Sequence, residues 1–153
     1  MSNKLNKTKV LDFIKSNTTT EIATVINNKP SVAVVVYVTD KKLNFYFVTH
    51  VGTRKAKNLL KNPYISLAIW EHYKMLIQAD GKATVVKDKK TKDWVMDGFA
   101  DIATADPNFW APIFKMSGSD YIIFKITPKW IRALDLSEST VNHKGSPFTE
   151  IKL

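Results

Sequence analysis

The chain has 153 residues, of which 44% are hydrophobic and 24% are charged, a composition typical of one globular domain that can bury its own core. It contains no cysteine, which excludes a disulfide framework, a thiol nucleophile and a thiolate metal site. The net charge of +9 raises nucleic-acid binding as a hypothesis, but the lysines are dispersed and no nucleic-acid-binding motif accompanies them, so we expect no nucleic-acid partner.

The N-terminal part of the chain changes from a helical to a β pattern. Residues 1–17 contain an amphipathic stretch from Leu5 to Ser16, which predicts a helix packed against a sheet. From Thr18 onward β-prone residues dominate, and short polar connections predict that successive strands are antiparallel neighbours. The run 31–39 is apolar at nearly every position, so we expect both its faces to be covered, either as a central barrel strand or under a subunit interface.

Six strand-like runs can be recognised along the chain: 19–26, 31–39, 43–49, 64–70, 75–86 and 121–126. The last run is expected to resume after Pro128, as 129–134. Further helices are expected at 53–61, at 87–105 and, as a short second piece, around Trp110, Ile113 and Phe114. Gly81 lies inside the fifth run, which suggests a β-bulge or a close backbone approach.

This order of elements predicts a mainly β fold with helices: a six-stranded antiparallel split β-barrel with an N-terminal helix, a helix after strand 3 and a helical excursion before the last strand. We expect a single domain, 1–153, with the barrel at 18–134 and an extended polar C-terminal tail at 135–153. The N-terminus lacks the apolar block of a signal peptide, and no apolar run is long enough to span a membrane, so we expect a cytoplasmic protein without a membrane partner.

The stretch from Phe45 to Leu60 predicts a strand, a tight turn and a helix capped by Thr53. Arg54 and Lys55 fall in the first helical turn, although the helix dipole favours acidic residues there. Two cations beside free backbone N–H groups form a plausible anion site, and phosphate is the anion most often bound in this way. The alternative is a solvated basic helix start.

Other signs of chemistry are few. His50, His72 and His143 have no spacing that would place two of them on one helix face, so we expect no metal site, although His50 adjoins the anion site and could polarise a ligand. The motifs of a serine nucleophile elbow, a dinucleotide fingerprint and a P-loop are missing. Trp94 and Trp110 lie at helical spacing, which favours core packing over a stacking surface for a planar ligand.

Four stretches, taken in order, carry a resemblance to a known family: ATVINNKPSVAVVVY, LNFYFVTHVGTRKAKNLLKNPYISLAI, IQADGKATVV and IIFKITPKWIRALDLS. Their order and spacing resemble the FMN-binding split-barrel family that includes pyridoxamine 5′-phosphate oxidase. The resemblance runs from about Thr20 to Ser137, and its most specific segment is T-x-x-x-S/T-R-K-A, at Thr49 to Ala56.

The resemblance implies that FMN is the cofactor and that the phosphate at the helix start belongs to it. Arg54 and Lys55 would hold this phosphate, and Thr53 would add its hydroxyl and backbone N–H. The other positions that it implies are Val48 and Thr49 along the ribityl chain and ring, the backbone of Val34, Val35, Val36 and Tyr37 at the polar ring edge, and Gln78 on the long strand. Members of this family are typically homodimers with flavin sites at the interface, which would cover the second face of run 31–39.

Two departures from the oxidase pattern separate this chain from a true pyridoxamine phosphate oxidase. Ala33 and Val38 replace an arginine and a lysine that serve FMN, and the arginine- and histidine-bearing C-terminal segment that binds the pyridoxal substrate is missing. The chain more closely resembles short members grouped with general stress proteins. We therefore expect an FMN-dependent oxidoreductase acting on another small substrate, or a non-catalytic binding protein for FMN, haem or a deazaflavin cofactor.

Overall fold

The computed structural model describes residues 5–109, 120–137 and 144–153. The elements of these residues, in chain order, are α1 (Lys7–Ser16), β1 (Thr19–Ile26), β2 (Lys29–Val36), β3 (Val38–Thr39), β4 (Phe45–His50), α2 (Arg54–Lys61), β5 (Tyr64–Glu71), β6 (Met75–Val85), α3 (Lys89–Ala105), β7 (Tyr121–Asp135) and β8 (Thr149–Glu150). The short helix expected around Trp110, Ile113 and Phe114 lies outside the described residues, as does His143.

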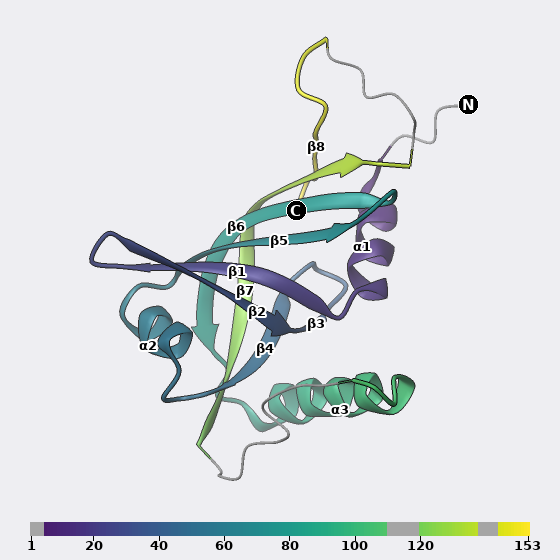
Figure 1. The fold of residues 1–153 in the computed structure, drawn as a ribbon. Coiled ribbons are helices and arrows are strands. Elements are labelled where there is room, and N and C mark those ends of the chain that lie inside the picture. The colour runs from purple at the N-terminus through teal and green to yellow at the C-terminus, as the bar shows by residue number, and fades with distance from the viewer. Residues whose placement is uncertain (1–4, 110–119, 138–143) are drawn as a thin grey trace.

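The strands form one curled antiparallel sheet in the order β2-β1-β5-β6-β7-β4-β3, and β8 is added alongside β7 (Figure 1). The two ends of this order, β2 and β3, are consecutive in sequence, and β2 also contacts β4, so the sheet curls into a half-barrel. The prediction of a mainly β, antiparallel split barrel with helices is confirmed. The described residues contain no helix with the length and apolar character needed to cross a bilayer.

The strand expected at 31–39 is divided in two at Tyr37. The N–H of Tyr37 donates to the carbonyl of Thr18 at 2.9 Å. Before this point the chain pairs with β1, as strand β2, and after it the chain pairs with β4, as strand β3. Of the two alternatives given for this run, the central barrel strand is wrong, and cover by a subunit interface stays a prediction. β2 is an edge strand, and Val32 and Val34 are 71% and 63% exposed.

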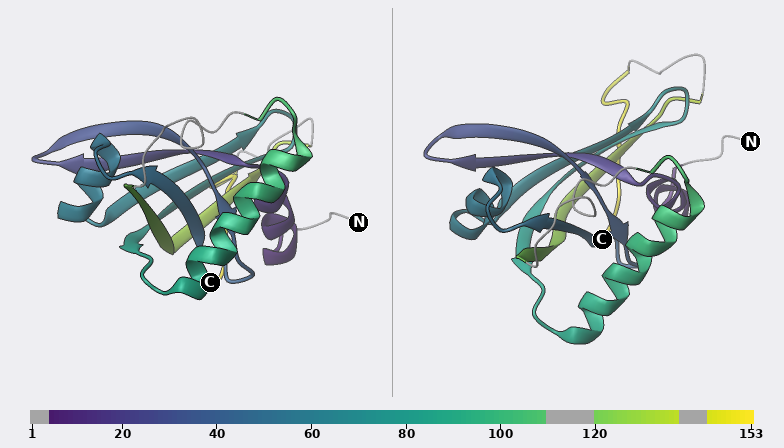
Figure 2. Two further views of the ribbon diagram at one scale, coloured as in Figure 1. Left: turned by 90° about the horizontal axis from the view of Figure 1, so that it is seen from below. Right: turned by 60° about the horizontal axis from the view of Figure 1, so that its bottom comes forward.

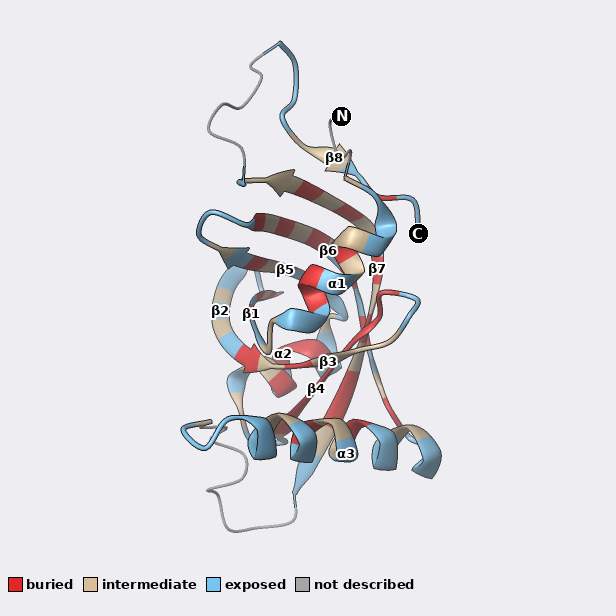
Figure 3. Cartoon of the chain, turned by 90° about the vertical axis from the view of Figure 1, so that its right-hand side faces the viewer, coloured by how far each residue is buried: buried red, intermediate tan, exposed pale blue. Residues whose placement is uncertain are grey.

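The main core lies inside the curl of the sheet. Alternate residues of β1, β5, β6 and β7 point inward, as the red bands in Figure 3 show, because side chains of a strand alternate between its two faces. The apolar sides of α1 and α2 join this core through residues such as Ile14 and Leu59. The outward face of β2, β1, β5 and β6 carries no described helix (Figures 1 and 3).

A second, smaller cluster lies under α3, which runs across the other side of β4 and the first half of β7 (Figure 2). Val95 and Phe99 of α3 pack there against Tyr46, Val48 and Ile123. Trp94, in contrast, is 42% exposed and touches Tyr46 edge-on, so the prediction that it is a core residue is wrong.

The bulge expected at Gly81 is confirmed. The register between β6 and β7 shifts between Asp80 and Gly81, and a Cβ on Gly81 would lie 2.4 Å from the carbonyl oxygen of Thr127. Only glycine allows this close approach of two backbones. Pro128 pairs with Gly81 and Lys129 is the extra residue of the bulge, so β7 is one continuous strand rather than the two pieces that the sequence suggested.

The C-terminal residues return to the sheet. β8 pairs with β7, and the N–H of Ile151 donates to the carbonyl of Ile131 at 3.0 Å. Ile151 is buried in the main core. The segment expected as a polar tail therefore ends against the barrel.

Candidate anion site at the start of helix α2

The turn between β4 and α2 is fixed by hydrogen bonds around Thr53. Its hydroxyl accepts the N–H of Ala56 at 3.3 Å, as the sequence predicted for the helix cap, and donates to the carbonyl of His50 at 3.0 Å. The hydroxyl of Thr49 lies 3.1 Å from it. Since Thr53 has given its only hydroxyl hydrogen to His50, Thr49 is the donor of this third bond.

The same turn orders the ring of His50. Its Nδ1 accepts the N–H of Gly52 at 3.0 Å, and a Cβ on Gly52 would lie only 3.1 Å from that nitrogen. Below the turn, Asn58 donates from α2 to the hydroxyl of Thr24 on β1 at 3.0 Å, in a buried position. These contacts hold the helix start rigidly at the end of β4.

The first turn of α2 is strongly electropositive. It carries no acidic residue, Arg54 is exposed and Lys55 is half-buried, and neither cation forms an ion pair with a carboxylate of the described residues. Burial lowers the pKa of Lys55 below its ordinary value of 10.5. The backbone N–H groups of Arg54 and Lys55 have no acceptor within the helix, because the first turn lacks preceding carbonyls. A bound anion would satisfy these donors and offset the burial of the Lys55 charge.

All predicted site residues except Gln78 fall into two groups. Val48, Thr49, His50, Thr53, Arg54 and Lys55 are brought together along the end of β4 and the start of α2. The second group lies at the end of β2 and in the link to β3, and consists of Val34, Val35, Val36 and Tyr37. It lies near the first group because β2 contacts β4. Within this second group Val35 and Tyr37 are buried, and the Tyr37 hydroxyl donates to the carbonyl of Ile14 at 2.6 Å, so these two side chains cannot meet a ligand, whereas Val34 is exposed.

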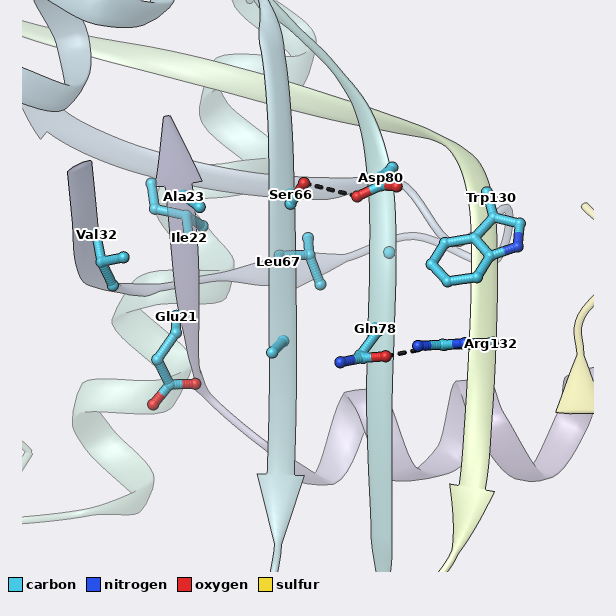
Figure 4. A pocket seen from close by; sticks show the side chains of 12 residues that line it. Glu21, Ile22, Ala23, Val32, Ser66, Leu67, Gln78, Asp80, Trp130 and Arg132 are labelled. Carbon is cyan, nitrogen blue, oxygen red and sulfur yellow. Dashed lines mark hydrogen bonds between the residues drawn. The ribbon is translucent and has the colours of Figure 1, made fainter. Parts of the chain in front are cut away.

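Gln78 lies apart from the turn, on the outward face of β6. It lines a cleft of about 400 Å³ together with Glu21, Ser66, Asp80 and Arg132 (Figure 4). The cleft also includes Trp130 on β7 and Val32 on β2. Sequence reasoning did not identify Arg132 or Trp130 as site residues, and the only available signal was the outward alternation of β7 beside Gln78.

The residues at the helix start fit a phosphate group. Two cations, two free backbone N–H groups and a capped helix N-terminus supply complementary charge and donors. Neither Ala33 nor Val38 adds a charge, and Val38 is packed against Gly98 of α3, where a Cβ would lie 2.9 Å from the valine. No group of three or more metal-binding side chains occurs in the described part of the chain.

Comparison with known proteins identifies the family. The family model described as pyridoxamine 5′-phosphate oxidase matches residues 7–135. No curated protein matches the sequence.

Three solved structures illustrate the range of similar folds. General stress protein 26 from Bacillus anthracis is 21% identical, with a TM-score of 0.64 and coverage of 83% of this chain and 92% of the other. An FAD-binding protein from Mesorhizobium loti is 14% identical, with a TM-score of 0.67 and coverage of 84% and 92%. HutZ, described as the haem storage protein of Vibrio cholerae, is 18% identical, with a TM-score of 0.61 and coverage of 82% and 92%.

At these identities the three structures establish a shared fold, whereas the family model spans most of the sequence itself. The resemblance seen in the sequence is confirmed. The chain belongs to the pyridoxamine 5′-phosphate oxidase family.

Proposed function

We propose that the protein is a cytoplasmic, homodimeric flavoprotein that binds FMN noncovalently and acts as an oxidoreductase on a small substrate. The observation that carries this proposal is the start of α2, where Arg54 and Lys55 flank free backbone N–H groups and no acidic residue is present. Such a site suits the phosphate of FMN. When bound, the flavin supplies two-electron redox chemistry, and the protein supplies position, shielding and hydrogen bonds.

Residues of two strands would position the rest of the cofactor. Val48 and Thr49 lie directly before the phosphate turn and would flank the ribityl chain and ring. The backbone of β2, from Val34 toward Tyr37, would meet the polar edge of the isoalloxazine. In support, β2 is an edge strand, and such a strand keeps a row of N–H and C=O groups without a partner in the sheet.

A second copy of the chain would cover the outward face of the sheet. Val32, Val34 and Trp70 are exposed on β2 and β5, and in the described residues no helix packs on them. Large exposed apolar side chains gathered on one sheet face commonly mark an interface. Packing of two such faces would place the two flavin sites near the contact between subunits, and Gln78 would lie there.

The second candidate is a binding protein without turnover, for FMN, haem or a deazaflavin cofactor. The uncharged Ala33 and Val38 favour it, because they leave the phosphate with fewer charged partners. The names of the relatives include both an FAD-binding and a haem storage protein. For haem, however, His50 is poorly arranged: its Nδ1 accepts a hydrogen bond, which leaves the proton of a neutral imidazole on Nε2.

Titration of the purified full chain with FMN and with riboflavin tests the proposal. We expect FMN to bind and riboflavin, which lacks the phosphate, to bind at least about tenfold more weakly, since charge-assisted hydrogen bonds are lost. Haem and a deazaflavin cofactor are titrated in parallel. Equal affinity for FMN and riboflavin, or no flavin binding, would overturn the proposal. Reduction of the bound flavin by NAD(P)H, followed by reoxidation with an acceptor, separates the enzyme from the binding protein.

A further inference from the structure

Arg132 is held from three sides in the cleft on the outward face of the sheet. Its Nε donates to Oε1 of Gln78 at 2.8 Å, on the neighbouring strand β6 (Figure 4). Its guanidinium carbon lies 4.0 Å from the ring centre of Phe148 and 5.0 Å from that of Trp130. Contacts of this kind fix the plane of a guanidinium in advance of any ligand.

The C-terminal strand makes this arrangement possible. Phe148 directly precedes β8, and Glu150 in β8 pairs in register with Arg132. Oε1 of Glu150 accepts the indole N–H of Trp130 at 3.1 Å, so both aromatic residues beside the guanidinium are fixed by the returning chain. The burial of Ile151 anchors that segment to the core.

The terminal nitrogens of Arg132 have no partner in the described residues. A guanidinium offers five N–H donors, of which the structure uses the one on Nε. No carboxylate of the described residues lies within ion-pair distance of it. Gln78 accepts through its amide oxygen, so its NH₂ group also faces the cleft as a donor.

Most of the remaining groups of the cleft are apolar or acidic. Ala23 and Ala68 leave room in its middle. Asp80 accepts the hydroxyl of Ser66 at 2.6 Å on the side opposite Gln78 and Arg132, and Glu21 projects from β1 at the far end (Figure 4). One edge of the cleft therefore offers donors with a positive charge, and the other edges offer acceptors with negative charge.

We propose that this cleft binds a small planar monocarboxylate. The carboxylate accepts parallel hydrogen bonds from Arg132, the geometry for which a fixed guanidinium is suited, and the planar body lies over Ala23 and Ala68. Asp80 and Glu21 disfavour a second negative charge and accept N–H or O–H groups of the ligand. A second copy packed on Val32 and Val34 would enclose this ligand at the interface.

Calorimetric titration of the full chain with benzoate, the neutral benzamide and inorganic phosphate tests the proposal. We expect benzoate to bind. Benzamide, which lacks the negative charge, and phosphate, which carries too much of it, should each bind at least about tenfold more weakly. Arg132→Gln should weaken benzoate about tenfold or more, and Arg132→Lys less than Arg132→Gln. Phe148→Ala, which frees the guanidinium, should lower benzoate affinity severalfold while the carboxylate is still preferred over the amide.

FMN titration of the same variants keeps the two sites distinguishable. Arg54→Ala should weaken FMN and leave benzoate unchanged, and Arg132→Gln should weaken benzoate and change FMN affinity by less than about threefold. Thermal melts test whether each variant is folded. If Arg132→Gln is unfolded, Arg132→Lys replaces it in the titrations. The proposal is overturned if wild-type protein does not bind benzoate, if Arg132→Gln binds it equally well, or if Arg132→Gln loses FMN and benzoate by the same factor. It is also overturned if Arg132→Gln and Glu21→Gln each convert a dimer to monomers, since Arg132 then pairs with a carboxylate of the second copy.

Discussion

The hydroxyl groups of Thr49 and Thr53 lie 3.1 Å apart and join the end of β4 to the cap of α2. With its bonds to Ala56 and His50, the Thr53 hydroxyl is fully used, and the N–H of Thr53 also donates to the carbonyl of His50. We therefore assign Thr53 chiefly the role of positioning the helix start. The free donors for an anion are the side chains and backbone N–H groups of Arg54 and Lys55.

Replacement of Thr53 by alanine should lower both stability and FMN affinity. Loss of the cap costs about 1 kcal/mol of unfolding free energy, because the N–H of Ala56 loses its acceptor. Thr53→Ser keeps the hydroxyl and should restore most of the loss. Urea denaturation and FMN titration of both variants measure this, and a serine variant as weak as the alanine variant would argue against the capping role.

Arg54→Ala and Lys55→Ala should each weaken FMN binding by about tenfold or more, since each removes a charged partner of the phosphate. Riboflavin affinity should stay unchanged in both variants. Lys57→Ala is the matched control, because Lys57 is exposed on the same helix beyond its first turn. If the control loses as much FMN affinity as the two variants, the effect is one of overall charge and not of a defined site.

FMN affinity should fall in alkaline solution because of Lys55. Burial lowers its pKa below 10.5, and a bound phosphate favours the ammonium form, so the pKa must rise again on binding. Affinity is then constant below the pKa of the free protein and declines as the pH rises through it. Lys55→Arg, whose charge persists above pH 12, should remove the decline. Dissociation constants of both proteins measured from neutral pH to about pH 10 would reveal it.

The sequence predicts local features of this fold well, because they depend on neighbours along the chain. Alternating apolar residues predict β5 and β6, Thr53 predicts the cap of α2, and Gly81 predicts the bulge. The break at Tyr37 was missed, since it depends on which strands β2 and β3 meet at opposite ends of the sheet.

The cleft at Arg132 could not be predicted for the same reason. Arg132 bonds to Gln78 across 54 positions of sequence, and Phe148 reaches it only because the chain returns as β8. No periodicity in the sequence encodes that register. The start of α2 was predictable as a possible anion site because all its donors lie within a few residues.

Gly81→Ala should destabilise the protein strongly, because the bulge leaves no room for a Cβ. The added methyl group would meet the carbonyl oxygen of Thr127 at 2.4 Å. The backbone of Thr127 and Pro128, which surrounds it, belongs to the continuous strand β7. Forcing the two strands apart should cost about 2 kcal/mol or more, as for other overpacked positions. Thr84→Ala, at an exposed position of the same strand, should change the unfolding free energy by less than about 0.5 kcal/mol. Equal losses in the two variants, measured by urea denaturation, would show that the bulge is not a tight contact.

Val34→Glu should convert the proposed homodimer to monomers. Val34 is 63% exposed on the outward face of β2, where a buried and unpaired carboxylate would oppose association. Leu60→Glu is the matched control, since Leu60 is 58% exposed but lies on α2, away from that face. Light scattering of the two variants and the wild type measures their masses. A wild-type protein that is monomeric at all concentrations would show that the interface does not exist. A Leu60→Glu variant that dissociates while Val34→Glu stays dimeric would place the interface elsewhere.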